Sequence, residues 1–238
     1  MKFTYSGYEN LIKTLKKNGY NFCNYHNYGN HDRECILRHD IDYSLDKSVD
    51  FAEFEKDIGV SSTYFVLFTS DFYNVSSKKS IEKISRIKVL GHEIGLHFDE
   101  TVYGTMDKKC LIEAVLKEKN LFEKITGQKI KTVSMHRPSK WILETDLKIP
   151  DMVNSYAKEF FNEFKYVSDS RMNWREDVMK YAEEASFSKL HILTHPFWYF
   201  DKDMSMHDVL DLFLASARKE RYDILKENFT DLESVIKR

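Results

Sequence analysis

Two aspartates and a histidine lie within four positions at the end of an apolar stretch of the chain. Residues 36–42 read ILRHDID, which is a strand-like run that ends in His39, Asp40 and Asp42. Carboxylates at the end of a buried strand are costly unless a metal ion, an arginine or a substrate compensates their charge. The segment therefore indicates the rim of an active site, and the alternative is a strand end capped by surface acids.

Residues of the same chemical kind follow four later segments that have strand composition. His97 ends the segment 92–97, His136 and Arg137 end 130–136, Asp169 ends 166–169, and His195 follows 190–194. Histidines scattered over a surface would not be expected to fall at strand ends in this way. The pattern predicts that these side chains gather at one edge of a sheet.

Together these residue types are suited to hydrolysing an amide or an ester. Asp42 and His97 offer one oxygen and one nitrogen ligand of the kind that zinc and related divalent metals favour. A bound metal lowers the pKa of its water and polarises a carbonyl group. Asp40 can then act as general base, His195 can protonate the leaving group, and Arg137 can hold Asp40 charged and oriented.

The elements that must position these residues alternate along the chain between strands and helices. The apolar spacing predicts helices over 7–19, 45–58, 77–90, 107–126, 151–164, 174–184 and 205–219, and strands over 35–40, 62–68, 92–97, 130–136, 166–169 and 190–194. Strands that alternate with helices of this length imply βαβ units and a parallel sheet. The sequence predicts one α/β domain over residues 1–238, a distorted (β/α) barrel with about seven parallel strands and its chemistry at their carboxyl ends.

Composition excludes several classes of protein. Lys and Arg number 36 and Asp and Glu number 38, so no basic excess indicates nucleic acid. No apolar run approaches the roughly 18 residues of a membrane-spanning helix, and the first 20 residues lack the apolar block of a signal peptide. Three widely spaced cysteines do not indicate a disulfide framework or a cysteine zinc site. We therefore expect a cytoplasmic protein without a membrane span.

Five short motifs resemble those of the polysaccharide deacetylase superfamily, which includes carbohydrate esterase family 4. In the order of that family they are RHDID (38–42), GHEIGLH (91–97), Arg137-Pro138, Asp169 with Trp174, and LTHP (193–196). The resemblance covers roughly residues 35–200 and implies a distorted (β/α) barrel. It also implies that the first motif carries the catalytic base and a metal-binding aspartate, and that His97 binds the metal. Arg137 would support the base, and His195 would act as the catalytic acid.

One departure from the family pattern concerns the third metal ligand. The family normally has a second metal-binding histidine four residues after the first, where this chain has Thr101. Glu100, Asp99 or His136 could replace it, and we expect Glu100 because the turn after His97 could direct its carboxylate inward. The remaining alternative is a weak site or one without a metal.

Further residues near the predicted strand ends could contact the substrate. His136 could be a metal ligand, a substrate contact or a neighbour of the arginine, and Asp169 with Trp174 belongs to the fourth motif. Trp198 follows His195 in an aromatic run, and its ring could form a sugar-stacking wall or pack in the core.

The resemblance implies a metal-dependent hydrolase that removes an acyl group from an N-acylated sugar. We expect a divalent metal, zinc first and then cobalt, nickel or iron, and a carbohydrate or nucleotide-sugar substrate. The alternatives are an amidohydrolase that acts on a small non-sugar C–N bond, and a carbohydrate-binding barrel without turnover. The sequence does not indicate an oligomeric state.

Overall fold

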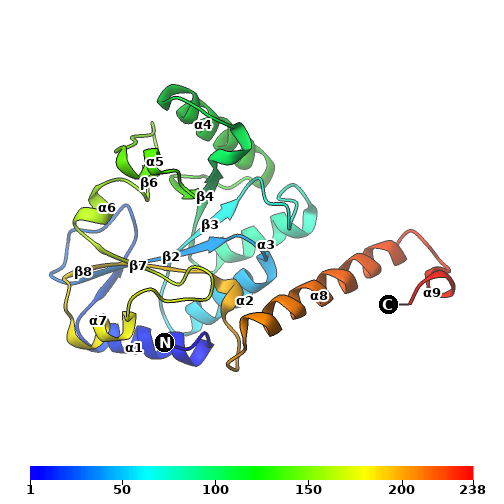
Figure 1. Ribbon diagram of the computed structural model, residues 1–238, viewed down its shortest axis with the longest axis horizontal. Coiled ribbons are helices and arrows are strands. Elements are labelled where there is room, and N and C mark those ends of the chain that lie inside the picture. Colours follow the sequence, from blue (N-terminus) through cyan, green and yellow to red (C-terminus); the bar gives the residue numbers. More distant parts are fainter. Residues whose placement is uncertain (238) are drawn as a thin grey trace.

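A curled parallel sheet forms the centre of the computed structural model, which describes residues 1–237 (Figure 1). The strand order is β6-β5-β4-β3-β2-β8-β7, and β1 pairs with β2 beside this path. The strands are β1 Asn21–Cys23, β2 Glu34–Ile41, β3 Thr63–Leu67, β4 Glu93–Asp99, β5 Thr132–His136, β6 Val153–Asn154, β7 Lys165–Ser168 and β8 Lys189–Thr194. Every pairing between these strands is parallel, so the predicted distorted (β/α) barrel is confirmed.

Helices cover the outer side of this sheet and supply most of its connections. They are α1 Tyr5–Lys17, α2 Leu45–Asp57, α3 Lys78–Val89, α4 Lys108–Thr126, α5 Lys140–Glu144, α6 Glu159–Asn162, α7 Val178–Glu184, α8 Met206–Lys226 and α9 Leu232–Val235, with short 3-10 turns η1 Glu100–Tyr103 and η2 Pro196–Trp198. Side chains of Thr4, Ser44, Ser77 and Asp107 cap the first backbone N–H groups of helices α1 to α4. These caps fix where each helix starts after its strand.

The sequence placed the long elements well and the short ones poorly. The prediction of one helix over 151–164 is wrong, because that region contains the short β6 and the four-residue α6. The sequence also missed β1 and α5, and α8 continues seven residues past the predicted end at 219. Elements of two to five residues are too short to produce a recognisable hydrophobic period.

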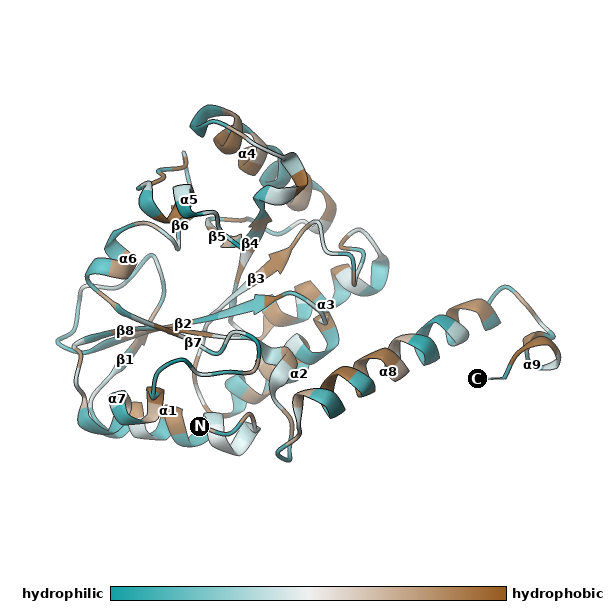
Figure 2. Ribbon diagram, viewed as in Figure 1, coloured by the Kyte–Doolittle hydropathy of each residue, from teal (hydrophilic) through white to brown (hydrophobic). Residues whose placement is uncertain are grey.

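The central strand β2 is buried along its whole length although half of its residues are polar. Figure 2 shows β2 as the hydrophilic strand of a sheet in which β3 is hydrophobic. Gly95 on β4 lies opposite Phe65 on β3, and a Cβ atom at Gly95 would come 2.5 Å from the Phe65 ring. The glycine therefore allows β4 to pair closely with β3, which lies between β4 and β2 in the sheet.

A buried carboxylate ties β2 and β3 to the helices behind the sheet. Glu55 on α2 accepts hydrogen bonds from the Tyr8 hydroxyl (2.6 Å), His39 Nε2 (2.9 Å) and the Tyr64 hydroxyl (2.9 Å), and from the Ser62 hydroxyl. Burial opposes ionisation of Glu55, but the charge and hydrogen bond of His39 lower its pKa to about 2. The carboxylate is therefore charged at neutral pH and acts as the hub of the region behind β2.

A second buried acid, Glu118 on α4, predicts a loss of stability as the pH rises from about 4.5 to about 7. One of its oxygens accepts a hydrogen bond from the Tyr103 hydroxyl (2.7 Å), and burial raises the pKa of Glu118 from 4.5 to about 7. A raised pKa in the folded state stabilises the protein below pH 4.5. This contribution declines as the pH rises to about 7, by up to roughly 3 kcal/mol. We expect urea unfolding at several pH values to show a flatter profile for Glu118→Gln. Equal slopes for both proteins between pH 5 and 8 would contradict the prediction.

Among residues 1–237, no helix is long and apolar enough to cross a membrane. All three cysteines are free, in agreement with the absence of a predicted disulfide framework. The expected cytoplasmic location and the single domain over residues 1–238 stay predictions.

Candidate active site

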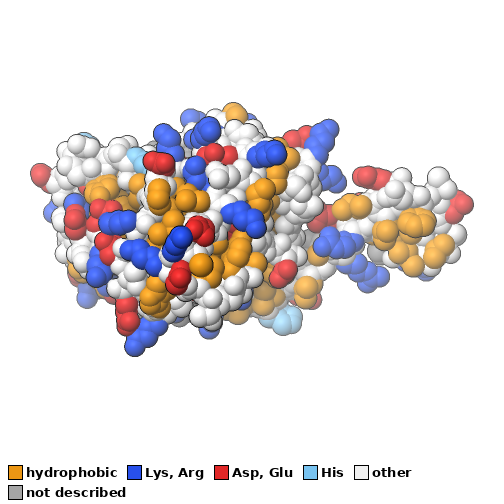
Figure 3. All heavy atoms as spheres, turned by 90° about the horizontal axis from the view of Figure 1, so that it is seen from above, with side chains coloured by type: hydrophobic (Ala, Val, Ile, Leu, Met, Phe, Trp, Pro, Cys, Tyr) orange, Lys and Arg blue, Asp and Glu red, His pale blue; other side chains and the backbone are white. Residues whose placement is uncertain are grey.

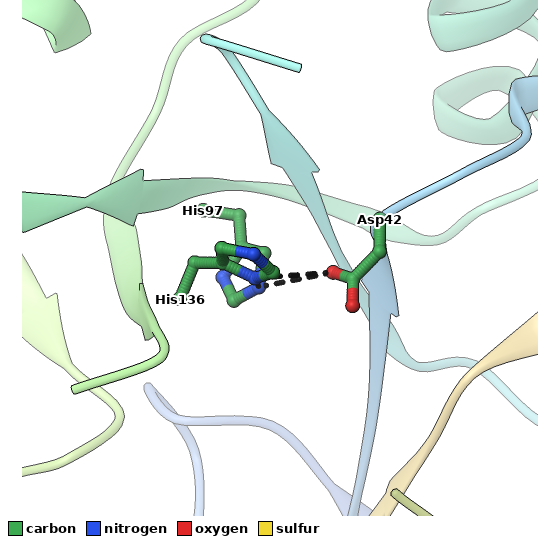
Figure 4. Close-up of side chains that lie close together, drawn as sticks. All are labelled: Asp42, His97 and His136. Atoms are coloured by element: carbon green, nitrogen blue, oxygen red, sulfur yellow. Dashed lines mark hydrogen bonds and ion pairs between the residues drawn. The ribbon is translucent and has the colours of Figure 1, made fainter. Parts of the chain in front are cut away.

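Three side chains that could hold a metal ion meet at the carboxyl ends of β2, β4 and β5. Figure 4 shows Asp42, His97 and His136 pointing toward one another from these strands. Asp42 Oδ1 lies 3.3 Å from His97 Nε2 and 3.4 Å from His136 Nδ1, and the two ring nitrogens are 3.1 Å apart. One carboxylate and two imidazoles thus converge where their side chains are largely buried.

The spacing of these atoms fits a tetrahedral divalent metal. An ion that binds ligands at about 2.0–2.1 Å in a tetrahedron separates them by about 3.3 Å, close to the three distances observed. Burial opposes ionisation of Asp42, but hydrogen bonds from His136 and His97 hold the pKa of its carboxyl well below the usual range. The charged aspartate and two imidazole nitrogens are the donor set that zinc, cobalt and nickel accept.

Asp40 lies beside this cluster and forms a buried ion pair with Arg38. The guanidinium binds it through two parallel hydrogen bonds, Nε to Oδ1 at 2.9 Å and Nη2 to Oδ2 at 2.8 Å, and also donates to the Ser134 hydroxyl. Asp40 Oδ2 is 3.5 Å from His97 Nε2. Burial opposes ionisation of Asp40, yet the Arg38 charge holds its pKa below the ordinary value. Asp40 is therefore a charged, oriented acceptor that borders the cluster.

His195 reaches the cluster from the end of β8 and is held by Asp169. Its Nδ1 lies 2.6 Å from Asp169 Oδ1, and its backbone N–H also donates to the same carboxylate. This contact directs Nε2 toward Asp42, whose Oδ2 is 3.8 Å away. Although burial favours the neutral ring, the Asp169 charge raises the pKa of His195 to about 9. The imidazole is therefore a proton donor at neutral pH.

Arg137 does not occupy the place that the sequence predicted for it. It is exposed, and its backbone has a left-handed φ of 50° directly after β5. The partner of Asp40 is Arg38, two residues earlier on the same strand. Side chains two residues apart on a strand share a face, so Arg38 reaches Asp40 without leaving β2.

Glu100 is likewise not the third member of the cluster. Its carboxylate accepts a hydrogen bond from the backbone N–H of Ser139, because η1 begins directly after β4 and turns Glu100 toward that loop. Thr101 donates its hydroxyl to Asp99 Oδ1 at 2.7 Å. His136, which the sequence left open as a ligand or a substrate contact, lies where we expected Glu100.

The predicted substrate contacts have different surroundings. Trp198 is only 5% exposed, and its ring packs against Phe197 and near Tyr43, so it belongs to the core and does not form a sugar-stacking wall. Asp169 is fully buried against His195, which gives it a positioning contact in place of a substrate contact. Trp174 is half-buried, and its role in substrate binding stays a prediction.

Arg38 is a site residue that the sequence did not single out, although it is the first residue of the RHDID motif. The signal was the spacing of Arg38, Asp40 and Asp42, which alternation along a strand places on one face. His136 carries a similar signal, because β5 pairs with β4 so that His136 lies opposite Asp99, on the same face as His97. The signal for Arg38 is present in the sequence itself, whereas the signal for His136 requires the pairing of β4 with β5, which the sequence did not provide.

No known family profile and no curated protein matches the sequence. Solved structures that resemble the chain include a CE4 family pseudoenzyme from Bacillus anthracis, with 15% identity and a TM-score of 0.45. The match covers 81% of this chain and 63% of the pseudoenzyme. The chitin deacetylase of Colletotrichum lindemuthianum has 15% identity and a TM-score of 0.45, with 77% of this chain and 81% of that chain covered. A family 4 carbohydrate esterase from Bacillus anthracis has 18% identity and a TM-score of 0.45, with 88% and 85% covered. The likeness concerns the fold alone.

Proposed function

We propose that the protein is a metal-dependent hydrolase that removes an acyl group from an N-acylated sugar. The observation that carries this proposal is the convergence of Asp42, His97 and His136 beside a charged base and an oriented acid. A binding module needs neither the Arg38–Asp40 pair nor the Asp169–His195 pair. The sugar is proposed from the motifs that resemble the deacetylase superfamily.

Each side chain of the site has a role that follows from its position. Asp40 accepts the proton of the attacking water, and Arg38 keeps it charged and fixed in direction. His195 donates a proton through Nε2 to the departing amine, since Asp169 occupies Nδ1. Once the C–N bond has broken, the acyl group leaves as a carboxylic acid and the sugar keeps a free amine.

Asp42, His97 and His136 are the residues that would hold the divalent metal, with zinc expected first. When bound, the ion supplies Lewis acidity, which polarises the acyl carbonyl and makes water more acidic. His136 completes the ligand set, so Thr101 does not mark a lost site.

Metal content tests this assignment independently of activity. We expect about one divalent ion per chain in the wild-type protein by elemental analysis, and loss of that ion in His97→Ala and in His136→Ala. Removing one of three protein ligands is expected to weaken binding at least a hundredfold, since even losing a residue that supports a ligand costs 10–100-fold. His207→Ala is the matched control, because His207 is exposed on α8 and is not one of the three converging ligands. Equal metal content in all four proteins would contradict the proposed ligands.

Substrate class is tested on the metal-loaded protein. N-acetylated sugars and nucleotide-sugars are compared with small non-sugar amides by detecting the released amine. Release from the sugars supports the proposal, and release from the small amides alone would assign the protein to the amidohydrolases. Metal binding without release from either class, together with carbohydrate binding, would indicate a barrel without turnover.

A further inference from the structure

Helix α8 extends away from the barrel and leaves one long face without a partner (Figure 1). Only Val209 and Tyr222 of its 21 residues are buried, and Phe213 fastens it to the barrel through ring contacts with Phe72 and Phe197. Figure 3 shows hydrophobic side chains gathered on the part of the molecule that protrudes. Such a helix needs a covering surface, because its apolar side chains are otherwise left in water.

The uncovered face has the spacing of a helix-pairing seam. It consists of Leu210, Leu214, Ala217, Arg221 and Ile224, which alternate at intervals of four and three residues. Leu214 is 67% exposed, and Leu210 and Ile224 are each 40% exposed. Figure 2 shows brown and teal segments alternating along the whole protruding helix. An apolar seam that extends over the helix fits another helix better than it fits a small ligand.

The charges of α8 identify a suitable occupant. The first half, residues 206–216, contains Asp208 and Asp211 and no Lys or Arg, whereas residues 217–226 contain four basic and two acidic residues. An antiparallel second copy of α8 would place the acidic half against the basic half. A parallel copy would oppose like charges.

We propose that the protein is a two-fold symmetric dimer in which α8 pairs antiparallel with α8 of a second copy. In the register centred between residues 215 and 216, Leu214 packs on the partner's Ala217, a large side chain against a small one. Asp211 then flanks the seam opposite the partner's Arg218, and the symmetry repeats this pair. Within the described residues neither Asp211 nor Arg218 has an ion-pair partner of its own chain. Arg221 lies against the partner's Leu210, where its aliphatic stem packs and its charged end reaches water.

The register places the two barrels at opposite ends of the helix pair. Residue 215 lies near the middle of α8, which at 1.5 Å per residue is about 31 Å long. Each barrel is fastened to its own helix in the first half, so the second half of each helix is free to lie beside the other barrel. The dimer therefore uses the protruding part of α8 and leaves the site at the strand ends within one copy.

Sedimentation equilibrium of the full chain over a wide protein concentration range tests this dimer. We expect the wild-type protein to have twice the chain mass of 28.3 kDa at high concentration. Leu214→Glu, at the centre of the seam, is expected to be monomeric throughout. Val89→Glu is the matched control, because Val89 at the end of α3 is an apolar residue of comparable exposure (74%), and it should leave the dimer unchanged.

A charge swap tests the antiparallel register. Asp211→Arg and Arg218→Asp should each raise the dissociation constant about tenfold, since each turns two attractive pairs into repulsive ones. The double variant restores both attractions and should return to the wild-type constant. A wild-type protein that is monomeric at every concentration would overturn the dimer. A double variant as weak as the two single variants would overturn the register.

Discussion

Asp40→Asn is expected to lower kcat about a thousandfold while the protein keeps its metal. The asparagine has the size of the aspartate but does not accept a proton at neutral pH, and general-base catalysis contributes about 10²–10⁴-fold. Asp40 is not one of the three converging ligand atoms, whose distances involve Asp42, His97 and His136. Elemental analysis and kcat measured on the same preparations check both parts of the prediction.

The buried Arg38 means that Asp40→Asn also lowers the stability of the fold, and a second substitution at Arg38 serves as the control. Asp40→Asn leaves the guanidinium of Arg38 without its carboxylate in a fully buried place, a loss of about 3–5 kcal/mol of folding free energy. Adding Arg38→Gln removes the uncompensated charge and should recover part of that stability. It should not recover turnover, because the base is still missing. If Asp40→Asn kept more than a tenth of wild-type kcat, Asp40 would not be the base.

Glu55→Gln is expected to destabilise the fold by about 3–5 kcal/mol, although Glu55 lies behind the sheet and away from the site. Four side-chain donors point at this one carboxylate, and an amide brings an NH₂ group into a place that needs only acceptors. Urea unfolding at pH 7 measures the loss. Glu53→Gln is the matched control, since Glu53 is on the same helix but forms an exposed pair with Arg86. A loss below 1 kcal/mol for Glu55→Gln would show that the hub does not carry the expected stability.

Acid unfolding provides a second readout for the same residue. The folded-state pKa of Glu55 is about 2, against an ordinary value of 4.5, so its contribution is complete above pH 4.5 and is lost as the pH falls to about 2. The difference in unfolding free energy between wild type and Glu55→Gln should therefore narrow across this window. A constant difference from pH 5 to pH 2.5 would contradict the low pKa of Glu55.

The composition and position of β2 explain why the sequence revealed the site. Asp40 and Asp42 follow an apolar run, and helices alternate with strands along the chain, so βαβ connectivity alone brings the strand ends to one edge. Reactive residue types at those ends identified Asp40, Asp42, His97 and His195 as neighbours before any strand order was known.

Only the tertiary structure decided which neighbours complete the site. Glu100 is three residues from His97 in sequence, but the turn after β4 carries it to Ser139, whereas His136 arrives from the adjacent β5. Arg137 directly follows a site residue and is exposed, while Arg38 reaches Asp40 along one face of β2. In the same way the sequence predicted a helix over 205–219, and only the fold showed that α8 leaves the barrel with one face uncovered. The sequence determined which residue types lie at the strand ends, because local hydrophobic periodicity is written in the chain. Their partners depend on strand pairing and side-chain direction, which long-range packing sets.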